Sequence, residues 1–233
     1  MNKKKESIII LICAIVIIAS IVAFFAIHAI NNSNNSFIFN EHLEDTIITI
    51  NFPKDTSERL NISSYNMPLK ELSYYILVME ANVNHSAALY NPENLNSYWN
   101  LYISNTFVRT EAKNNTMEVC LRDNIYYYEA LANGLDLNNE EKELVMQEAA
   151  YIYGNLTGKQ VNATELTMEN LYNVRYKIEL ACKYISKLMN ESDYTEEELN
   201  IDGSYYMPLF ESYDIEIDKL WNKIELGDIT IDK

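Results

Sequence analysis

The sequence predicts a mainly α-helical fold: an N-terminal transmembrane helix followed by an extracytoplasmic domain of about four long helices, with one small two-stranded ribbon. Three observations lead to this fold class. The 233 residues include only five glycines and four prolines, the residues that most often interrupt helices. Four segments repeat apolar residues at the helical period of 3.6. An uncharged apolar run at 8–30 has the length that a membrane-spanning helix needs.

The N-terminal part combines this apolar run with a basic start. Residues 1–7 read MNKKKES, and no formally charged side chain follows from Ile8 to Ile30. At 1.5 Å rise per residue the run is about 34 Å long, enough to cross a hydrocarbon core of about 30 Å. The positive-inside rule places the lysines in the cytoplasm. We therefore predict a cytoplasmic tail over 1–7, a transmembrane anchor over 8–30 and a single-pass cell-membrane protein.

Two kinds of processing are alternatives to a permanent anchor. Ile27 and Ala29 loosely fit the small-residue rule of signal peptidase, although the apolar run far exceeds the usual ~7–15 residues. Cys13 suggests a lipoprotein, but it follows Ile12 instead of a small residue. Retention of the anchor is the preferred interpretation.

A polar linker is expected over 31–44, because its start, NNSNNS, has no means of burying a core. Without Lys3–Lys5 and Glu6, the totals of 18 basic and 34 acidic residues fall to 15 and 33, so the outer part carries a net charge near −18. Nucleic acids and anionic lipid surfaces are recognised by basic patches. The charge therefore argues against both as partners of the outer domain.

The outer domain, expected over 45–226, starts with the β-branched run Thr46–Phe52. An isolated strand leaves its backbone N–H and C=O groups unpaired. The other alternating segment is Tyr213–Ile217, near the C-terminus. We expect the two to pair as a ribbon that joins the ends of the domain, followed by a tail over 227–233. The residues expected between ribbon and helices are Ile48 or Ile50, Ile215 or Ile217, and Trp221.

Four long helices are expected between these strands, at about 68–89, 110–133, 139–156 and 167–190. Pro68 suits the first turn of the first helix. Gly134 suits the left-handed position after the second, and Asn138 or Asn139 begins the third. Thr195 and Glu198 form a capping-box pattern that predicts a further short helix.

Residue patterns typical of catalysis are absent from the sequence. The segment GNLTGKQ at 154–160 is one residue short of a phosphate-binding loop and lacks the Ser or Thr after the lysine. Cys120 and Cys182 lie on apolar helix stripes, where cysteine acts as a small hydrophobe, and a disulfide between them stays open. No histidine has a second metal ligand at suitable spacing or a nearby nucleophile: His28, His42 and His85. We therefore expect no enzyme, no metal and no cofactor.

Eighteen tyrosines are the most unusual feature of the composition. Most such rings lie at the edge of a core with the hydroxyl in water. Rings and methionines also line grooves that hold varied polypeptides. We expect a minority, in the loop 90–102 and the cluster 126–128, to contact a polypeptide. The candidate binding residues are Tyr90, Tyr98, Trp99, Tyr102, Tyr126 and Tyr127.

The order of these parts resembles the N-terminal chaperone domain of SurA/PrsA-like foldases, in the form found in low-GC Gram-positive bacteria. The resemblance covers most of 45–226 and consists of helix-end patterns. It rests on Tyr98-Trp99 in an aromatic loop, YYYEALANGLDLNNEEKE at 126–143, LTMENLYNVRYKIELACKYISKL at 166–188 and YDIEIDKLWNKIEL at 213–226. It implies a helical domain that binds polypeptides.

One departure from this family bears on activity. Its full-length foldases insert a parvulin prolyl-isomerase domain after the fourth helix, whereas here only a short connection over 190–212 is present, and an independent domain needs at least ~50 residues. The resemblance therefore implies a membrane-anchored extracytoplasmic chaperone for unfolded or newly exported polypeptides, without isomerase activity. Two alternatives stay open: a dedicated interaction protein that binds one folded membrane or cell-surface partner, and an enzyme without a recognisable motif.

Overall fold

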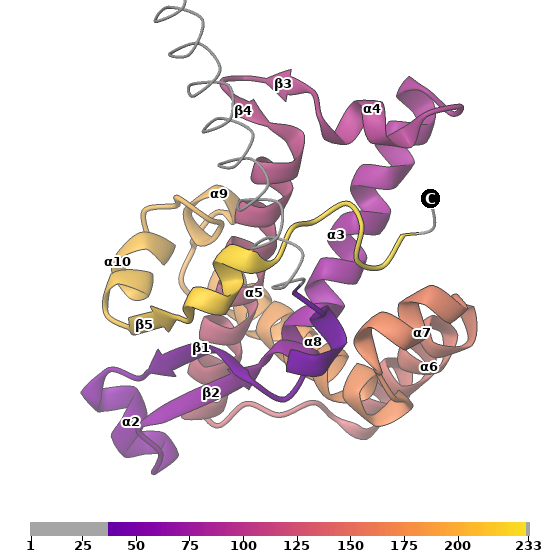
Figure 1. Ribbon diagram of the computed structural model, residues 1–233. Coiled ribbons are helices and arrows are strands. Elements are labelled where there is room, and N and C mark those ends of the chain that lie inside the picture. The colour runs from indigo at the N-terminus through magenta and orange to yellow at the C-terminus, as the bar shows by residue number, and fades with distance from the viewer. Residues whose placement is uncertain (1–36, 232–233) are drawn as a thin grey trace, which may run out of the picture. The chain divides into compact units, whose positions relative to one another are not determined.

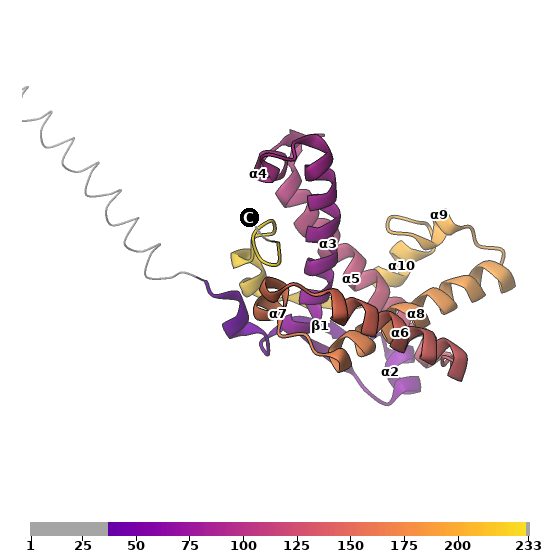
Figure 2. The same ribbon diagram turned by 90° about the vertical axis from the view of Figure 1, so that its right-hand side faces the viewer.

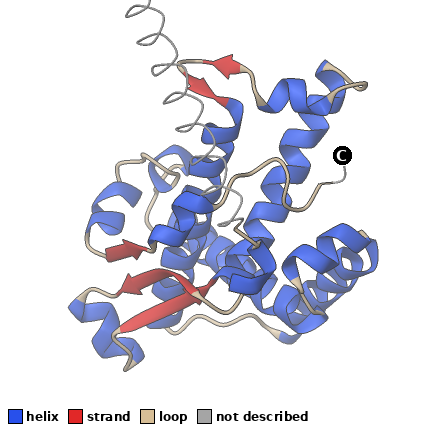
Figure 3. Cartoon of the chain, viewed as in Figure 1, coloured by secondary structure: helices blue, strands red, loops and turns tan. Residues whose placement is uncertain are grey.

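The computed structural model describes residues 37–231, where long helices pack with a small antiparallel sheet (Figures 1 and 3). The long helices of this part are α3 (Leu69–Tyr90), α5 (Val108–Ala132), α6 (Asn139–Asn155) and α8 (Met168–Glu191). The shorter ones are α2 (Lys54–Leu60), α4 (Leu95–Trp99), α7 (Gly158–Thr164), α9 (Glu196–Leu199), α10 (Tyr206–Glu211), η1 (Phe39–His42) and η2 (Lys219–Lys223). The strands are β1 (Thr46–Asn51), β2 (Ser64–Pro68), β3 (Tyr102–Ile103), β4 (Thr106–Phe107) and β5 (Asp214–Ile217).

The predicted fold class, a membrane helix and a helical domain with one two-stranded ribbon, does not hold for the described residues, and the ribbon itself is wrong. No helix within residues 37–231 is long and apolar enough to cross a membrane. The predicted cytoplasmic tail at 1–7 and anchor at 8–30 lie outside the described residues. In place of a two-stranded ribbon, the structure has a three-stranded sheet in the order β2-β1-β5 and a separate hairpin of β3 and β4.

The three-stranded sheet does join the two ends of the domain. β1 pairs with β5, as the sequence predicts, and the pairing is antiparallel, with Ile48 opposite Ile217 and Ile50 opposite Ile215. The strand that was missed, β2, pairs with the other edge of β1. Its sequence, SYNMP, contains no β-branched residue, so its extended form depends on pairing with β1 and not on local preference.

The core lies where this sheet meets the helices. Ile47, Ile48 and Ile50 of β1 are fully buried, and so is Met67 of β2. Trp221 of η2 is 8% exposed, and the Lys113 ammonium of α5 lies over its ring. Each such buried side chain contributes about 1.5–3 kcal/mol.

The long helices begin and end within two residues of the predicted bounds. α8 packs against both α5 and α6, and α3 packs against α5. Figure 2 shows α3 rising away from β1 toward α4, with the first turns of α5 beside it. We call this projecting part the arm: residues 79–90 of α3, α4, the β3–β4 hairpin and residues 108–115 of α5. The rest of the domain is the base.

The turn between α5 and α6 follows the predicted capping chemistry. Gly134 has a φ of 71°, and the N–H groups of Gly134 and Leu135 donate to the carbonyls of Leu131 and Ala130, each at 2.9 Å. This is a Schellman motif, for which glycine is the favoured left-handed residue. Asn138 then caps α6 through a capping box with Glu141. The two helices are thereby joined by a short turn of fixed geometry.

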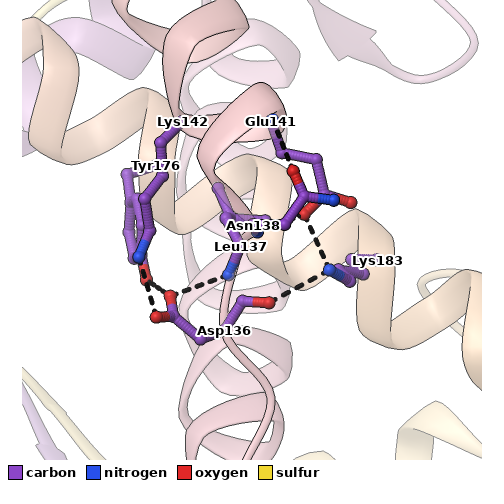
Figure 4. A network of polar contacts seen from close by, with 7 residues as sticks. All are labelled: Asp136, Leu137, Asn138, Glu141, Lys142, Tyr176 and Lys183. Atoms are coloured by element: carbon purple, nitrogen blue, oxygen red, sulfur yellow. Dashed lines mark hydrogen bonds and ion pairs between the residues drawn. The ribbon is translucent and has the colours of Figure 1, made fainter.

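Polar contacts fasten this turn to α8 (Figure 4). The Asp136 carboxylate accepts hydrogen bonds from Lys142 at 2.8 Å and from the Tyr176 hydroxyl. Lys183 donates to the Asp136 carbonyl at 3.0 Å and to the Glu141 carboxylate at 2.7 Å. The hydrogen bonds from Lys142 and Tyr176 lower the pKa of Asp136 to about 2. The turn, α6 and α8 therefore form one connected unit.

Candidate polypeptide-binding groove

A groove of about 400 Å³ lies in the arm, between α3 and α5. The β3–β4 hairpin and Tyr98 of α4 complete its wall. Its lining side chains are Met79, Asn82, Val83 and Ser86 of α3, Tyr98, Ile103, Ser104 and Thr106 of the tip, and Val108, Glu111, Ala112 and Asn115 of α5. Apolar and neutral polar side chains thus make up most of the lining. Grooves of this composition bind apolar groups and orient them with a few hydrogen bonds.

The helical period places these side chains in the groove. Met79 and Val83 continue the apolar stripe of α3 that begins with Leu69, Leu72 and Ile76. The first three stripe residues are fully buried, whereas Met79 and Val83 are half-buried. The stripe therefore extends beyond the region that other helices cover. Its upper end lines the groove instead of the core.

Large apolar side chains also project around the groove. Tyr102 is 62% exposed and Phe107 52%, and their rings meet edge to face with centroids 5.1 Å apart. The remaining exposed members of this group are Leu89, Tyr90 and Ile103. A cluster of exposed large apolar residues is a common mark of an interaction surface.

The β3–β4 hairpin sets the position of this exposed cluster. Its two turn residues, Ser104 and Asn105, have φ values of 51° and 69°, which correspond to the left-handed turns that suit tight hairpins. Tyr102 pairs with Phe107, and Ile103 pairs with Thr106. The hairpin leaves little trace in the sequence, because each strand has two residues and the turn lacks glycine. The positive φ of Ser104 has no clear sequence signal.

The candidate residues from the sequence divide between the arm and the base. Tyr98 lines the groove, and its ring lies 5.6 Å from that of Tyr90, which is 58% exposed. Tyr102 stands on the exposed face of the hairpin. Trp99 is fully buried, which corrects its assignment as a contact residue, since the ring packs behind the groove.

The tyrosine cluster at 126–128 lies in the base, away from the groove. Tyr126 is fully buried, and its hydroxyl donates to the Leu199 carbonyl at 2.6 Å. Tyr127 is half-buried, with its ring 5.6 Å from the ammonium of Lys177. Tyr126 is therefore corrected as well, because it is a core residue that fixes α9. Tyr127 packs over α8, and its candidacy stays a prediction.

A C-terminal strap, residues 224–231, lies alongside α3 (Figure 1) and packs against Trp99 at Gly227. The buried carboxylate of Glu80 accepts hydrogen bonds from the N–H groups of Gly227, Ile229 and Thr230, and from the Thr230 hydroxyl at 2.6 Å. These donors satisfy a buried charge that would otherwise be costly. The predicted tail at 227–233 is thus corrected, because its described part is built into the fold.

Gly227 allows the strap to approach Trp99. Its φ is 106°, and a Cβ added there would lie 2.9 Å from Trp99 Cδ2. Both the backbone conformation and the close approach favour glycine. On the α5 side, Arg109 lies 3.8 Å from Asp228, and the Lys113 ammonium lies 5.0 Å from the Trp221 ring centroid. The strap and η2 therefore connect the two helices that form the groove walls.

The buried charged groups of the base have partners within the fold. Lys177 pairs with Glu71 at 2.6 Å, and Glu71 accepts a hydrogen bond from the Tyr65 hydroxyl at 2.5 Å. Burial, followed by the negative charge of Glu71, raises the pKa of Tyr65. Glu129 accepts from the hydroxyls of Thr56 and Tyr213. These contacts fix the packing of β2, α2 and the C-terminal segment.

The described chain offers little for metal or thiol chemistry. Residues 37–231 contain no cluster of three or more metal-binding side chains. Cys120 is buried and Cys182 exposed, and both are free thiols, so the disulfide that the sequence left open is not formed. Burial raises the pKa of both thiols, which disfavours the reactive thiolate. Of the features described, the groove is the best candidate for a ligand site.

Comparison with models of protein families, with curated proteins and with solved structures found no match.

Proposed function

We propose that the domain binds unfolded polypeptides as a chaperone-like protein, through the groove of the arm and the apolar side chains around it. The observation that carries this proposal is a groove of about 400 Å³ lined mostly by apolar and neutral polar side chains, in an arm whose hairpin also exposes Tyr102, Ile103 and Phe107. An unfolded chain supplies the apolar side chains that such a surface can cover.

The groove also carries side chains suited to a polypeptide backbone. Asn82, Ser86 and Asn115 line it together with the apolar residues. Amide and hydroxyl groups donate and accept hydrogen bonds, so they can pair with peptide N–H and C=O groups of any sequence. Methionine and tyrosine adapt to varied side chains. Weak contacts of this kind suit clients of many sequences.

A matched pair of variants tests this function. Ile103 lines the groove and Ile62 lies in the turn before β2, and both side chains are 47% exposed. We expect the full-length chain, kept in a mild detergent, to slow the aggregation of several unrelated unfolded proteins. Ile103→Ser should weaken this effect and Ile62→Ser should not. If no unfolded protein is protected, or if both variants act alike, the proposal is wrong.

A second candidate function, binding of one folded partner, is favoured by the surface of α6. Tyr151 is 75% exposed and Leu144 59%, one heptad apart on one face of the helix. Tyr151 also borders a second hollow of about 440 Å³ beside the Arg175–Glu148 ion pair. A single partner that co-purifies stoichiometrically, and is lost in Tyr151→Ser but retained in Ile103→Ser, would favour this function over the chaperone.

A further inference from the structure

We propose that the groove prefers polypeptide segments in which lysine or arginine accompanies apolar side chains, and that Glu111 is the residue that sets this preference. The inference rests on the proposed polypeptide-binding function and adds the chemical class of the ligand. It follows from the distribution of charge around the groove.

Glu111 is the one formally charged side chain among the described residues that line the groove. It is exposed, in the first turn of α5. Across residues 37–231, no side chain forms an ion pair or a hydrogen bond with its carboxylate. It is therefore available to a cationic group of a ligand that lies in the groove.

The basic residues nearest to Glu111 in sequence do not line the groove. Arg109 faces Asp228 of the strap and stacks 5.9 Å from the Trp99 ring centroid. Lys113 lies over the ring of Trp221. Both cations are thus directed toward the C-terminal segment, while Glu111 borders the opposite side of the helix pair. The strap therefore leaves the groove with an uncompensated negative charge.

The charge of the whole chain acts in the same direction. The formal net charge is −16 at pH 7. A net negative field attracts cationic ligands and repels anionic ones, most strongly at low ionic strength. An apolar segment with basic residues is bound more tightly, because both the apolar groove and the negative field attract it. An acidic segment is attracted by the apolar groove alone.

Three labelled peptides with one apolar sequence test the preference. They carry paired lysines, serines or glutamates at the same positions, with both termini blocked so that no other charge differs. Binding to the full-length chain is measured by fluorescence anisotropy. At low salt we expect the lysine peptide to bind roughly three- to ten-fold more tightly than the glutamate peptide. At 1 M salt, where the Debye length is about 3 Å, the difference should largely disappear.

Two variants separate Glu111 from the general field. Glu111 and Glu118 are both exposed residues of α5, but only Glu111 lines the groove. Each Glu→Gln change removes one negative charge and so alters the net charge equally. We expect Glu111→Gln to lower the lysine-to-glutamate affinity ratio about two- to three-fold, and Glu118→Gln to lower it clearly less.

The outcomes distinguish this inference from the function on which it rests. Equal binding of the three peptides to the wild-type chain, with loss in Ile103→Ser, overturns the charge preference and leaves polypeptide binding intact. Equal effects of Glu111→Gln and Glu118→Gln overturn the assignment to Glu111. Failure of all three peptides to bind at any salt concentration overturns the proposed function itself.

Discussion

In the base of the domain, the buried charged groups have partners within the fold, whereas the arm carries large apolar side chains that remain exposed. Glu129 receives two hydroxyl hydrogen bonds in the base, and Lys177 pairs with Glu71. In the arm, Leu89 is 77% exposed and Tyr102 62%. Exposed apolar groups contribute little to stability. The comparison teaches that the base supplies most of the stability, whereas the arm presents apolar surface that a ligand can cover.

Within the arm, the exception is Glu80, a buried charged residue that binds the strap of the base. Glu80 lies on the same helix as Met79 and Val83, yet its carboxylate is fully buried and holds the strap. Along α3, therefore, one face serves stability through the strap and the other faces the groove. Variants on these two faces should separate stability from binding.

The largest expected effect comes from removing the chain after Ser212. This truncation deletes β5 together with the buried side chains of Trp221, Ile224 and Leu226. Each such side chain contributes about 1.5–3 kcal/mol, and a typical domain has only about 5–15 kcal/mol in total. We expect the base to unfold, with loss of helical circular dichroism and rapid amide exchange over β1. If the amides of β1 exchange equally slowly in the truncated chain, β5 does not hold the sheet.

The next largest effect is expected from Glu80→Ala. The change leaves three N–H groups of the strap without an acceptor, two of them buried and that of Ile229 half-buried, and each buried group left unpaired costs about 1–3 kcal/mol. We expect a loss of several kcal/mol in the free energy of unfolding, measured with urea. Glu118→Ala, at an exposed position of α5, should change it by less than about 0.5 kcal/mol. Equal stability of the two variants would show that the strap contributes nothing.

The sequence predicted those elements whose signals are local. The long helices follow from apolar periodicity and from caps such as Gly134 and Asn138, and β1 was found from its β-branched run. β2 was missed because SYNMP becomes a strand only by pairing with β1. The strap was missed because a glutamate on α3 that binds backbone N–H groups some 150 residues later has no local pattern.

The candidate site was predicted in part for a related reason. Aromatic residues between two helices pointed to Tyr90, Tyr98 and Tyr102, all of which lie in the arm. Composition alone does not separate an exposed ring from a buried one, so Trp99 and Tyr126 were included although the structure buries both. The apolar stripe of α3 contained Met79 and Val83, but the point at which the stripe leaves the core depends on tertiary packing.

A smaller effect is expected at the α5–α6 turn, and it depends on pH. The pKa of Asp136 is lowered to about 2 by hydrogen bonds from Lys142 and Tyr176, against about 3.9 in an unfolded chain. A depressed pKa stabilises the fold above the unfolded value, and this contribution is lost as pH falls from about 4 toward 2. Asp136→Asn should therefore lower the melting temperature slightly at neutral pH. Between about pH 4 and pH 2, the melting temperature of this variant should decrease less than that of the wild-type chain. If the melting temperatures of the two proteins decrease in parallel from pH 6 to pH 2, this prediction is wrong.

The smallest effect on stability is expected in the arm, from Tyr102→Ser. The ring is 62% exposed and meets the fold mainly through Phe107, so the free energy of unfolding should change by about 0.5 kcal/mol or less. Binding of an unfolded polypeptide should fall about fivefold or more, since loss of one contacting aromatic side chain commonly costs 1 kcal/mol or more. Tyr151→Ser is the matched control, because that tyrosine is 75% exposed on α6 and lies outside the groove. Two results would contradict this prediction: Tyr102→Ser destabilises the domain as strongly as Glu80→Ala, or it leaves the affinity for the polypeptide unchanged, as Tyr151→Ser should. In either case the arm is not the ligand-binding surface, and its exposed apolar side chains have another explanation.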